Sequence, residues 1–232
     1  MKYKLSFSLF LLVSLTVFAQ EDEQDSNPLQ TTRQSFGDYR GLNMTVGFVN
    51  PKTRTEGSAY YYENWDSEAI IYLKEQGRYK VENANINLYD NTLETLYNDN
   101  NVFTFNTDEL LQFAIDGKIF RPLVQDGELK LFELFFNKGI TVYKHYSISY
   151  TKSSPNPMIN RRTNKYMRSE RFYVDINGSL EKLKLTNRAF SKLFATDALS
   201  ADDIKAFIES KDLSLKEENQ LKEILEFIAQ QP

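Results

Sequence analysis

The chain has 232 residues, of which 41% are hydrophobic and 14% aromatic, so it can bury one sizeable core or two small ones. It contains no cysteine, which excludes disulfides, thiolate nucleophiles and cysteine-based metal sites, and argues against the lipid anchor of a bacterial lipoprotein. Its formal net charge is −4, but the charge is distributed unevenly along the chain.

The first 19 residues have the organisation of a secretory signal peptide. Lys2 and Lys4 form a positive head, residues 5–18 form an apolar run, and Val17 and Ala19 put small or medium residues just before a cleavage site. The run is shorter than the roughly 20 apolar residues that span a membrane, which argues against a membrane-spanning helix. The alternative is a retained N-terminal anchor. We expect an exported protein, periplasmic or extracellular, that is soluble after cleavage, has no transmembrane segment and is not a lipoprotein.

Residues 20–43 are predicted to form a flexible leader, because 21–35 are polar and show no apolar period. From residue 44 onward aromatic and β-branched residues become dense, and turn signals such as Asp116-Gly117 and Asp126-Gly127 recur at short spacing. Strands that are interrupted this often favour an antiparallel sheet, because helical crossovers need more chain. We therefore predict a mainly β (α+β) fold, with an antiparallel β sandwich or partly open barrel over residues 44–185.

The clearest strands lie in the second half of this β domain. Residues 141–150 alternate between a largely apolar and a largely polar face, and residues 171–176 continue the alternation on the next strand. Asn177-Gly178 follows, and Asn-Gly between alternating runs is the strongest short signal for a β-hairpin. The sequence thus predicts a hairpin that turns at these two residues.

After residue 185 the apolar period changes to that of an α-helix. Thr186, Ser200 and Ser214 each stand where an N-cap is expected, and Ser200 has Asp203 at the capping-box position. The apolar stripes that follow predict two or three short helices over residues 186–232. We expect the stripes to pack on the sheet or on one another, because helices this short are marginal alone in water. A partner-binding groove is the alternative.

Residues 152–192 carry an unusual charge, with ten Lys and Arg against three Asp and Glu. Cationic and aromatic side chains interleave here, which suits nucleic acid, but a protein exported into a bacterial envelope meets lipid headgroups, lipopolysaccharide and acidic polysaccharide instead. We predict that this stretch contacts an anionic envelope component or an acidic protein partner, and no nucleic acid. The predicted binding residues are Arg161, Arg162, Lys165, Arg168 and Arg171. The alternative is a long exposed hairpin whose edge Lys and Arg protect from pairing.

No catalytic residue, metal-ligand set or cofactor motif is predicted elsewhere. His145, the single histidine, is expected to be a surface or cross-strand residue, because one histidine without cysteine builds none of the common zinc sites. Carboxylates such as Asp90 and Glu94 are plentiful, but their spacing marks no site. The Tyr-rich segment that begins at Tyr60 could stack against a polysaccharide, but strands favour Tyr in any case.

Several segments of the chain follow one another in a recognisable order: a small-aromatic entry, a strand, a Gly turn, an Asn- and Tyr-containing strand end, a second strand block and closing helices. They are Gly57-Ser58-Ala59-Tyr60, Trp65, residues 69–74, Gly77-Arg78-Tyr79, residues 85–90, Leu93-Glu94, residues 132–139 and residues 204–228. In this order they resemble a group of uncharacterised exported proteins of Bacteroidota, although Ala59 and Glu68 stand where the group would carry Pro and Gly. The resemblance implies a signal peptide, a Tyr-rich antiparallel β domain and C-terminal helices, and it brings no catalytic residue.

These features predict an exported, non-enzymatic binding or structural module of the bacterial envelope that needs no cofactor. One alternative is a carrier of a hydrophobic small ligand, which would require an enclosed apolar cavity in the β domain. A second is a carbohydrate-active enzyme, which would require two carboxylates converging in a cleft beside exposed Tyr or Trp.

Overall fold

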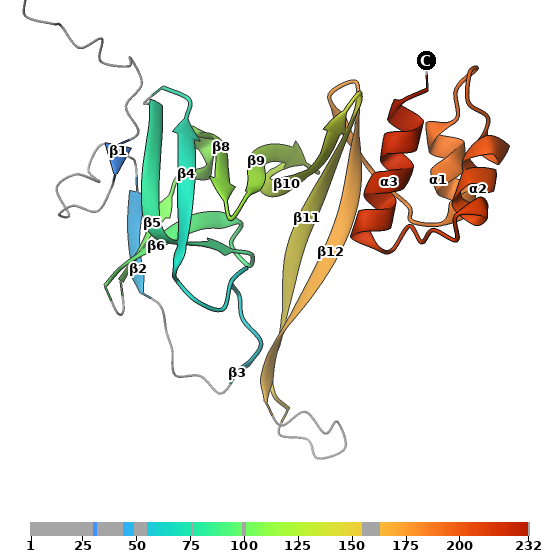
Figure 1. Ribbon diagram of the computed structural model, residues 1–232. Helices are drawn as coiled ribbons and strands as arrows, with labels where there is room; N and C mark the ends of the chain where they lie inside the picture. Colours follow the sequence, from blue (N-terminus) through green and yellow to red (C-terminus); the bar gives the residue numbers. More distant parts are fainter. Residues whose placement is uncertain are drawn as a thin grey trace, which may run out of the picture.

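A computed structural model describes residues 30–31, 44–48, 55–75, 77–98, 101–154 and 163–231, the first two ranges as backbone only. The predicted signal peptide, 1–19, lies outside these residues, and so does the predicted leader, 20–43, apart from Gln30–Thr31. The protein is mainly β, as predicted: one large, mostly antiparallel open sheet is followed by three C-terminal helices (Figure 1).

The strand order of the sheet is β13-β12-β11-β10-β9-β8-β4-β5-β6-β7-β2. The two-residue strands β1 and β3 pair in parallel with β5 and β12, and every other pair among the described strands is antiparallel. The strands are β1 Gln30–Thr31, β2 Met44–Phe48, β3 Thr55–Glu56, β4 Ser67–Leu73, β5 Gly77–Asn87, β6 Thr92–Asn98, β7 Asn101–Phe105, β8 Leu110–Ile115, β9 Lys118–Gln125, β10 Glu128–Lys138, β11 Ile140–Thr151, β12 Asn164–Ile176 and β13 Ser179–Lys182.

Two-residue turns connect several neighbouring strands. The residues of the Asp116-Gly117 turn have φ of 46° and 76°, and those of the Asn177-Gly178 turn have φ of 54° and 83°. Positive φ at both central positions defines the type I′ turn, whose twist matches that of the flanking strands. The predicted hairpin at Asn177-Gly178 is therefore confirmed, at the point where β12 turns into β13.

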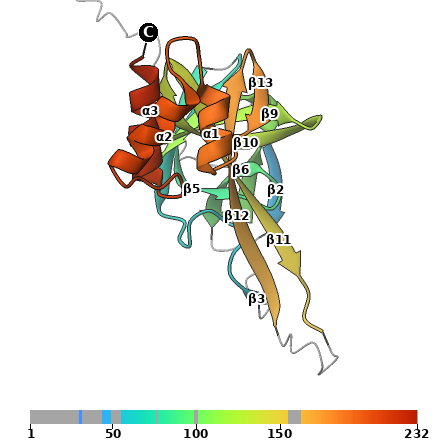
Figure 2. The same cartoon turned by 90° about the vertical axis from the view of Figure 1, so that its right-hand side faces the viewer.

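The sheet curls on itself. β3 leads into β4, near the middle of the strand order, yet it pairs with the N-terminal end of β12. Gly57 permits this approach, because a Cβ on this residue would lie 2.8 Å from the carbonyl oxygen of Tyr166. β11 and β12 form a long hairpin that extends away from the rest of the sheet (Figures 1 and 2).

Two large hydrophobic cores share the sheet, and a third, small cluster holds Phe132, Tyr143 and Tyr173. The first fills the curled half and includes Phe113, Phe120 and Tyr146. The second lies between β10–β12 and the helices and includes Val142. Because side chains alternate along a strand, Val142, Lys144 and Tyr146 point to the same face of β11. Lys144 therefore lies between one core and the other.

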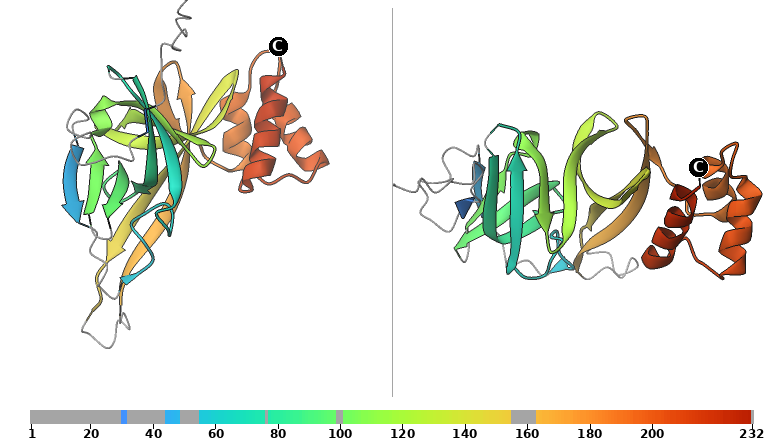
Figure 3. Two further views of the ribbon diagram at one scale, coloured as in Figure 1. Left: turned by 60° about the vertical axis from the view of Figure 1, so that its left-hand side comes forward. Right: turned by 45° about the horizontal axis from the view of Figure 1, so that its top comes forward.

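The three helices lie together at one end of the molecule, beyond β12 (Figures 1 and 3). They are α1 (Asn187–Phe194), α2 (Ala201–Ser210) and α3 (Glu218–Ala229), and a short 3₁₀ turn, η1 (Thr107–Glu109), precedes β8. Their apolar stripes face the second core, which they share with residues of β10, β11 and β12.

The helix starts follow the sequence in one case and depart from it in another. The predicted capping box is confirmed, since Ser200 Oγ accepts a hydrogen bond from the Asp203 N–H at 3.2 Å and the Asp203 carboxylate accepts one from the Ser200 N–H at 3.1 Å. The predicted helix start at Ser214 is wrong. The Ser214 hydroxyl accepts from the N–H of Lys216 and closes a turn, and α3 begins only at Glu218.

Candidate functional site

The hairpin of β11 and β12 carries the basic residues that were predicted to bind an anion, and it separates them. Arg161 and Arg162 lie outside the described residues. Lys165, Arg168 and Arg171 lie on β12, where alternation points Arg168 to one face and the other two residues to the opposite face. These three side chains therefore do not form one cluster.

Arg168 packs on two aromatic rings, although its side chain stays 33% exposed. Its guanidinium lies 4.3 Å from the ring centre of Tyr61 and 4.4 Å from that of Tyr146. It also donates a hydrogen bond to the backbone oxygen of Tyr61 at 3.3 Å and lies 3.5 Å from the Glu170 carboxylate. These contacts use both the planar face and the donors of the guanidinium. Arg168 thus fixes the loop before β4 against the hairpin.

Lys165 and Arg171, on the opposite face of β12, are exposed. Lys165 lies 3.8 Å from the carboxylate of Glu56 on β3, and Arg171 stands opposite His145 of β11. Glu56 thus balances Lys165 and Glu170 balances Arg168, whereas Arg171 has no ion-pair partner among the described residues.

A layer of charged and hydroxyl groups separates the two cores, and we call it the ionic layer. Its residues are Tyr61, Lys118, Glu133, Lys144, Tyr146, Glu170 and Glu218. The Glu133 side chain is only 7% exposed, and both of its oxygens accept from Lys118 Nζ at 3.0 Å. The Tyr146 hydroxyl also donates to Glu133, and the Tyr61 hydroxyl donates to Tyr146 at 3.3 Å.

The titration of this layer favours a fixed structure. Burial, followed by the hydrogen bond to Glu133, raises the pKa of Tyr146 above its ordinary value. Burial would lower the pKa of Lys118, but the neighbouring Tyr61 and Glu133 outweigh it, and the pKa is raised. Both donors therefore keep their protons at neutral pH. They hold the Glu133 carboxylate in place and are not poised to exchange a proton.

Lys144 forms the second half of the ionic layer. Its side chain is 3% exposed, and its ammonium group lies 2.5 Å from Glu170 and donates to Glu218 at the start of α3. Burial acts to raise the pKa of Glu218, but the hydrogen bond and the charge of Lys144 outweigh it, so the pKa lies below its ordinary value. Lys144 thus ties α3 to β11 and β12.

His145 lies on the opposite face of β11 and is buried, at 7% exposure. His145 pairs across the strands with Phe132 and Arg171, so the predicted cross-strand position is confirmed. The alternative prediction of a surface residue is wrong. Its Nδ1 lies 3.1 Å from the carbonyl oxygen of Leu131, which can only accept, so Nδ1 carries the proton. Burial lowers the pKa of His145, which makes it a poor proton acceptor at neutral pH.

The carboxylates near the β5–β6 turn serve the turn itself. Glu94 is buried, and its Oε1 accepts from Asn87 and Thr92 while its Oε2 accepts from the Tyr60 hydroxyl, each at 3.0 Å. Asn87 also donates to Asp90 at 2.9 Å. Because both Glu94 oxygens have donors within the protein, this carboxylate stabilises the turn.

A pocket of about 410 Å³ lies where β13 leads into α1. We call it the lysine pocket, and its lining residues are Lys182, Lys184, Ala189, Lys192 and Leu193. All three lysines are exposed, and within the part of the chain that the structure describes none of them has an ion-pair partner. The excess of basic residues over 152–192 predicted a cationic surface. Among the described residues of that stretch, these three lysines meet at one pocket near its end, whereas Arg171, which has no ion-pair partner in the described ranges either, stays on the hairpin.

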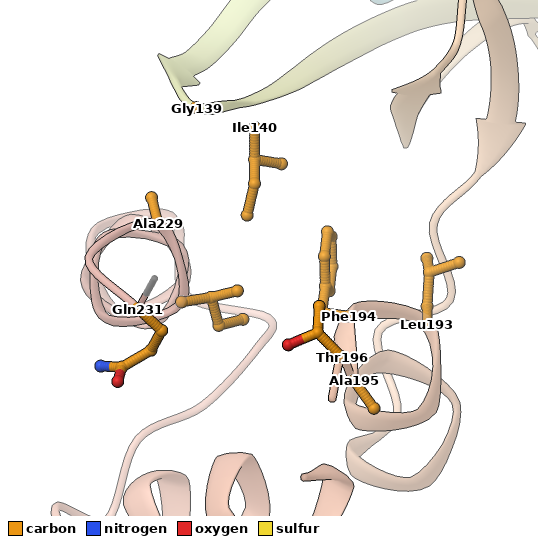
Figure 4. Close-up of a pocket in the computed structure, with 9 residues that line it drawn as sticks. Gly139, Ile140, Leu193, Phe194, Ala195, Thr196, Ala229 and Gln231 are labelled. Carbon is orange, nitrogen blue, oxygen red and sulfur yellow. The ribbon is translucent and has the colours of Figure 1, made fainter. Parts of the chain in front are cut away.

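A second pocket, of about 330 Å³, lies between the β10–β11 turn, the end of α1 and the end of α3 (Figure 4). We call it the apolar pocket, and its lining residues are Gly139, Ile140, Leu193, Phe194, Ala195, Thr196, Ile228, Ala229 and Gln231. None of them is charged. No feature of the sequence pointed to this pocket, because its walls come from three elements far apart along the chain.

Comparison with known proteins gives no match to any family model, curated sequence or solved structure. The resemblance to exported proteins of Bacteroidota therefore stays a prediction. Within the described ranges, no group of three or more His, Asp or Glu side chains could hold a metal ion. The helices of these ranges are too short or too polar to cross a membrane.

Proposed function

We propose that this protein is an exported, non-enzymatic binding module that captures an anionic component of the bacterial envelope at the lysine pocket. The observation that carries the proposal is the convergence of Lys182, Lys184 and Lys192 on one pocket, with no carboxylate paired to any of them among the described residues. Export rests on the signal-like N-terminal sequence, and the envelope setting rests on the resemblance.

The charges around this pocket favour an anion. Three ammonium groups on one rim repel each other, and an anion bound between them relieves that repulsion. Arg188 adds a fourth cation near the pocket. It lies on α1, four residues before Lys192 and therefore on the same side of the helix. Ala189 and Leu193 add apolar surface to the same pocket.

The same lining supports binding without catalysis. The side chains of the lysine pocket are ammonium groups, one methyl group and one isobutyl group. They include no carboxylate, imidazole or hydroxyl group that could serve as a general base beside the lysines. The lining therefore favours holding an anion by charge.

The proposal is tested by titrating the full chain with glycerol phosphate while recording amide chemical shifts. We expect saturable shifts at Lys182, Lys184 and Lys192, and an affinity that falls as salt is added. Replacing all three with Gln should weaken binding roughly tenfold or more, because each charged hydrogen bond that is lost costs affinity.

A matched control removes the same charge elsewhere. The triple replacement of Lys74, Lys138 and Lys216 by Gln changes three exposed lysines outside the pocket. It should leave the affinity for glycerol phosphate nearly unchanged. Equal binding by the two triple variants, or binding that ignores salt, would show that the pocket is not an anion site.

A further inference from the structure

The lysine pocket and the apolar pocket meet at Leu193, which lines both of them. Ala189, Lys192 and Leu193 stand at i, i+3 and i+4 of α1, so they share one face of the helix. Residues 194–196 follow directly and line the apolar pocket. The two pockets therefore lie next to each other along α1, the first lined by cations and the second uncharged, and we call this pair of pockets the path.

The apolar end of this path is built from three separate elements. Ile140 of β11 and Phe194 of α1 face each other across the pocket, and Ala229 of α3 lies to one side of them (Figure 4). The side chain of Gln231 points outward, so its amide leaves the apolar surface uncovered (Figure 4). Such a surface gains free energy by covering itself with hydrocarbon in place of water.

We propose that the ligand is a single-chain anionic amphiphile, such as an alkyl phosphate. Its head group lies among Lys182, Lys184 and Lys192, and its alkyl chain crosses Leu193 and enters the apolar pocket. This inference rests on the proposed function, because its head-group site is the lysine pocket. The charge pattern argues for this occupant, since cations stand at one end only and the lining of the other end is uncharged.

The size of the path agrees with one small ligand. The two volumes, about 410 and 330 Å³, each lie near the lower end of the roughly 300–1,000 Å³ of small-molecule sites. A head group fits the first pocket and a single chain fits the second. A protein partner would instead need an interface of roughly 1,000 Å² or more, well beyond these two pockets.

The test is a series of ligands that share one head group. Glycerol phosphate and octyl, decyl and dodecyl phosphate, each below its micelle concentration, are titrated calorimetrically into the full chain. We expect the affinity to rise about fourfold for each methylene that is buried, until the apolar pocket is full. Dodecyl maltoside, which has the same chain on an uncharged head group, should bind much more weakly than dodecyl phosphate.

A pair of variants locates the chain. Ala195→Phe adds a ring at the exposed rim of the apolar pocket and should abolish the gain with chain length without changing the affinity for glycerol phosphate. Ala206→Phe makes the same change on an exposed position of α2 and is the control. Ala229→Leu fills the pocket from α3. It is a second, independent test in case the ring introduced by Ala195→Phe turns away from the pocket.

The outcomes separate this inference from the proposed function. Glycerol phosphate binding at the lysines without any gain from the chain would overturn the amphiphile and leave the anion site standing. A full chain-length gain in Ala195→Phe and Ala229→Leu would place the chain elsewhere and overturn it as well. No binding by any of the phosphates would overturn both proposals.

Discussion

Lys144 is the residue at which the two cores of this protein meet. A buried ammonium group is costly unless other groups replace its hydration. Here Glu170 and Glu218 accept from it, and the rings of Tyr146 and Phe172 lie 4.7 and 5.5 Å from its nitrogen. The Lys144 side chain thus joins β11, β12 and α3, and its ion pairs fix the positions of Glu170 and Glu218.

Gly57 is a second residue on which the curled sheet depends. Its φ is 76°, and a Cβ would lie 2.8 Å from the carbonyl oxygen of Tyr166. Gly57→Ala should therefore destabilise the protein twice, by about 1 kcal/mol for the positive φ and by roughly 1–3 kcal/mol for the clash. Urea unfolding at neutral pH measures the sum.

Gly117 supplies the control for this prediction. It has the same φ of 76°, but nothing lies within 4 Å of its added Cβ. Gly117→Ala should cost the backbone strain alone, so the difference between the two variants isolates the contact between β3 and β12. Equal losses of stability would mean that the close approach of Gly57 to Tyr166 of β12 contributes nothing.

Elements whose cause is local could be predicted from the sequence. Asn177-Gly178 needs only two residues that tolerate positive φ, and Ser200 needs only Asp203 three positions later. Ser214 misled for the same reason, because its hydroxyl forms a local hydrogen bond to Lys216 that also occurs in a turn outside a helix. Local chemistry identifies a turn or a cap but does not decide how far the element then extends.

The candidate site depended on partners distant in sequence. In the sequence Arg168 looks like a free cation. In the structure it contacts Tyr61, which lies more than 100 residues earlier in the chain. Lys182 and Lys192 lie in the same basic stretch and meet no carboxylate among the described residues. The count of charges over 152–192 therefore predicted a cationic surface and could not say which residues form it.

The attachment of α3 to the sheet should depend on pH. The pKa of Glu218 is depressed in the folded state, so its contribution to stability is present above the ordinary value of 4.5 and is lost as the pH falls through the lower folded pKa. Glu218→Gln should cost about 1 kcal/mol at neutral pH, discounted because the carboxylate is partly exposed. Urea unfolding of both proteins from neutral to acidic pH should show this difference shrinking.

Glu217→Gln is the matched control, since it removes the neighbouring exposed carboxylate, which has no described contact with Lys144. Its stability relative to the parent chain should change little with pH. A pH-independent difference for Glu218→Gln would contradict the tether between α3 and β11.

At the scale of the whole molecule, the two cores share their central strands. β10 contributes Leu131 to the first core and Phe135 to the second, and β11 contributes Tyr146 and Val142 in the same way. Opening either core therefore exposes residues on strands that the other core needs. The helices and the curled half of the sheet should unfold as one cooperative unit.

Two probes report on the two ends separately. Trp65, the single tryptophan, packs on Tyr60 with ring centres 4.8 Å apart beside the first core, whereas far-ultraviolet circular dichroism follows the helices. Both signals should give one coincident transition in urea.

Phe190→Ala in α1 removes a fully buried ring of the second core and should cost about 3–5 kcal/mol. Because the cores share β10 and β11, both transitions should move together to lower urea. A dichroism transition that moves while the Trp65 fluorescence transition stays would mean that the helices unfold independently of the sheet.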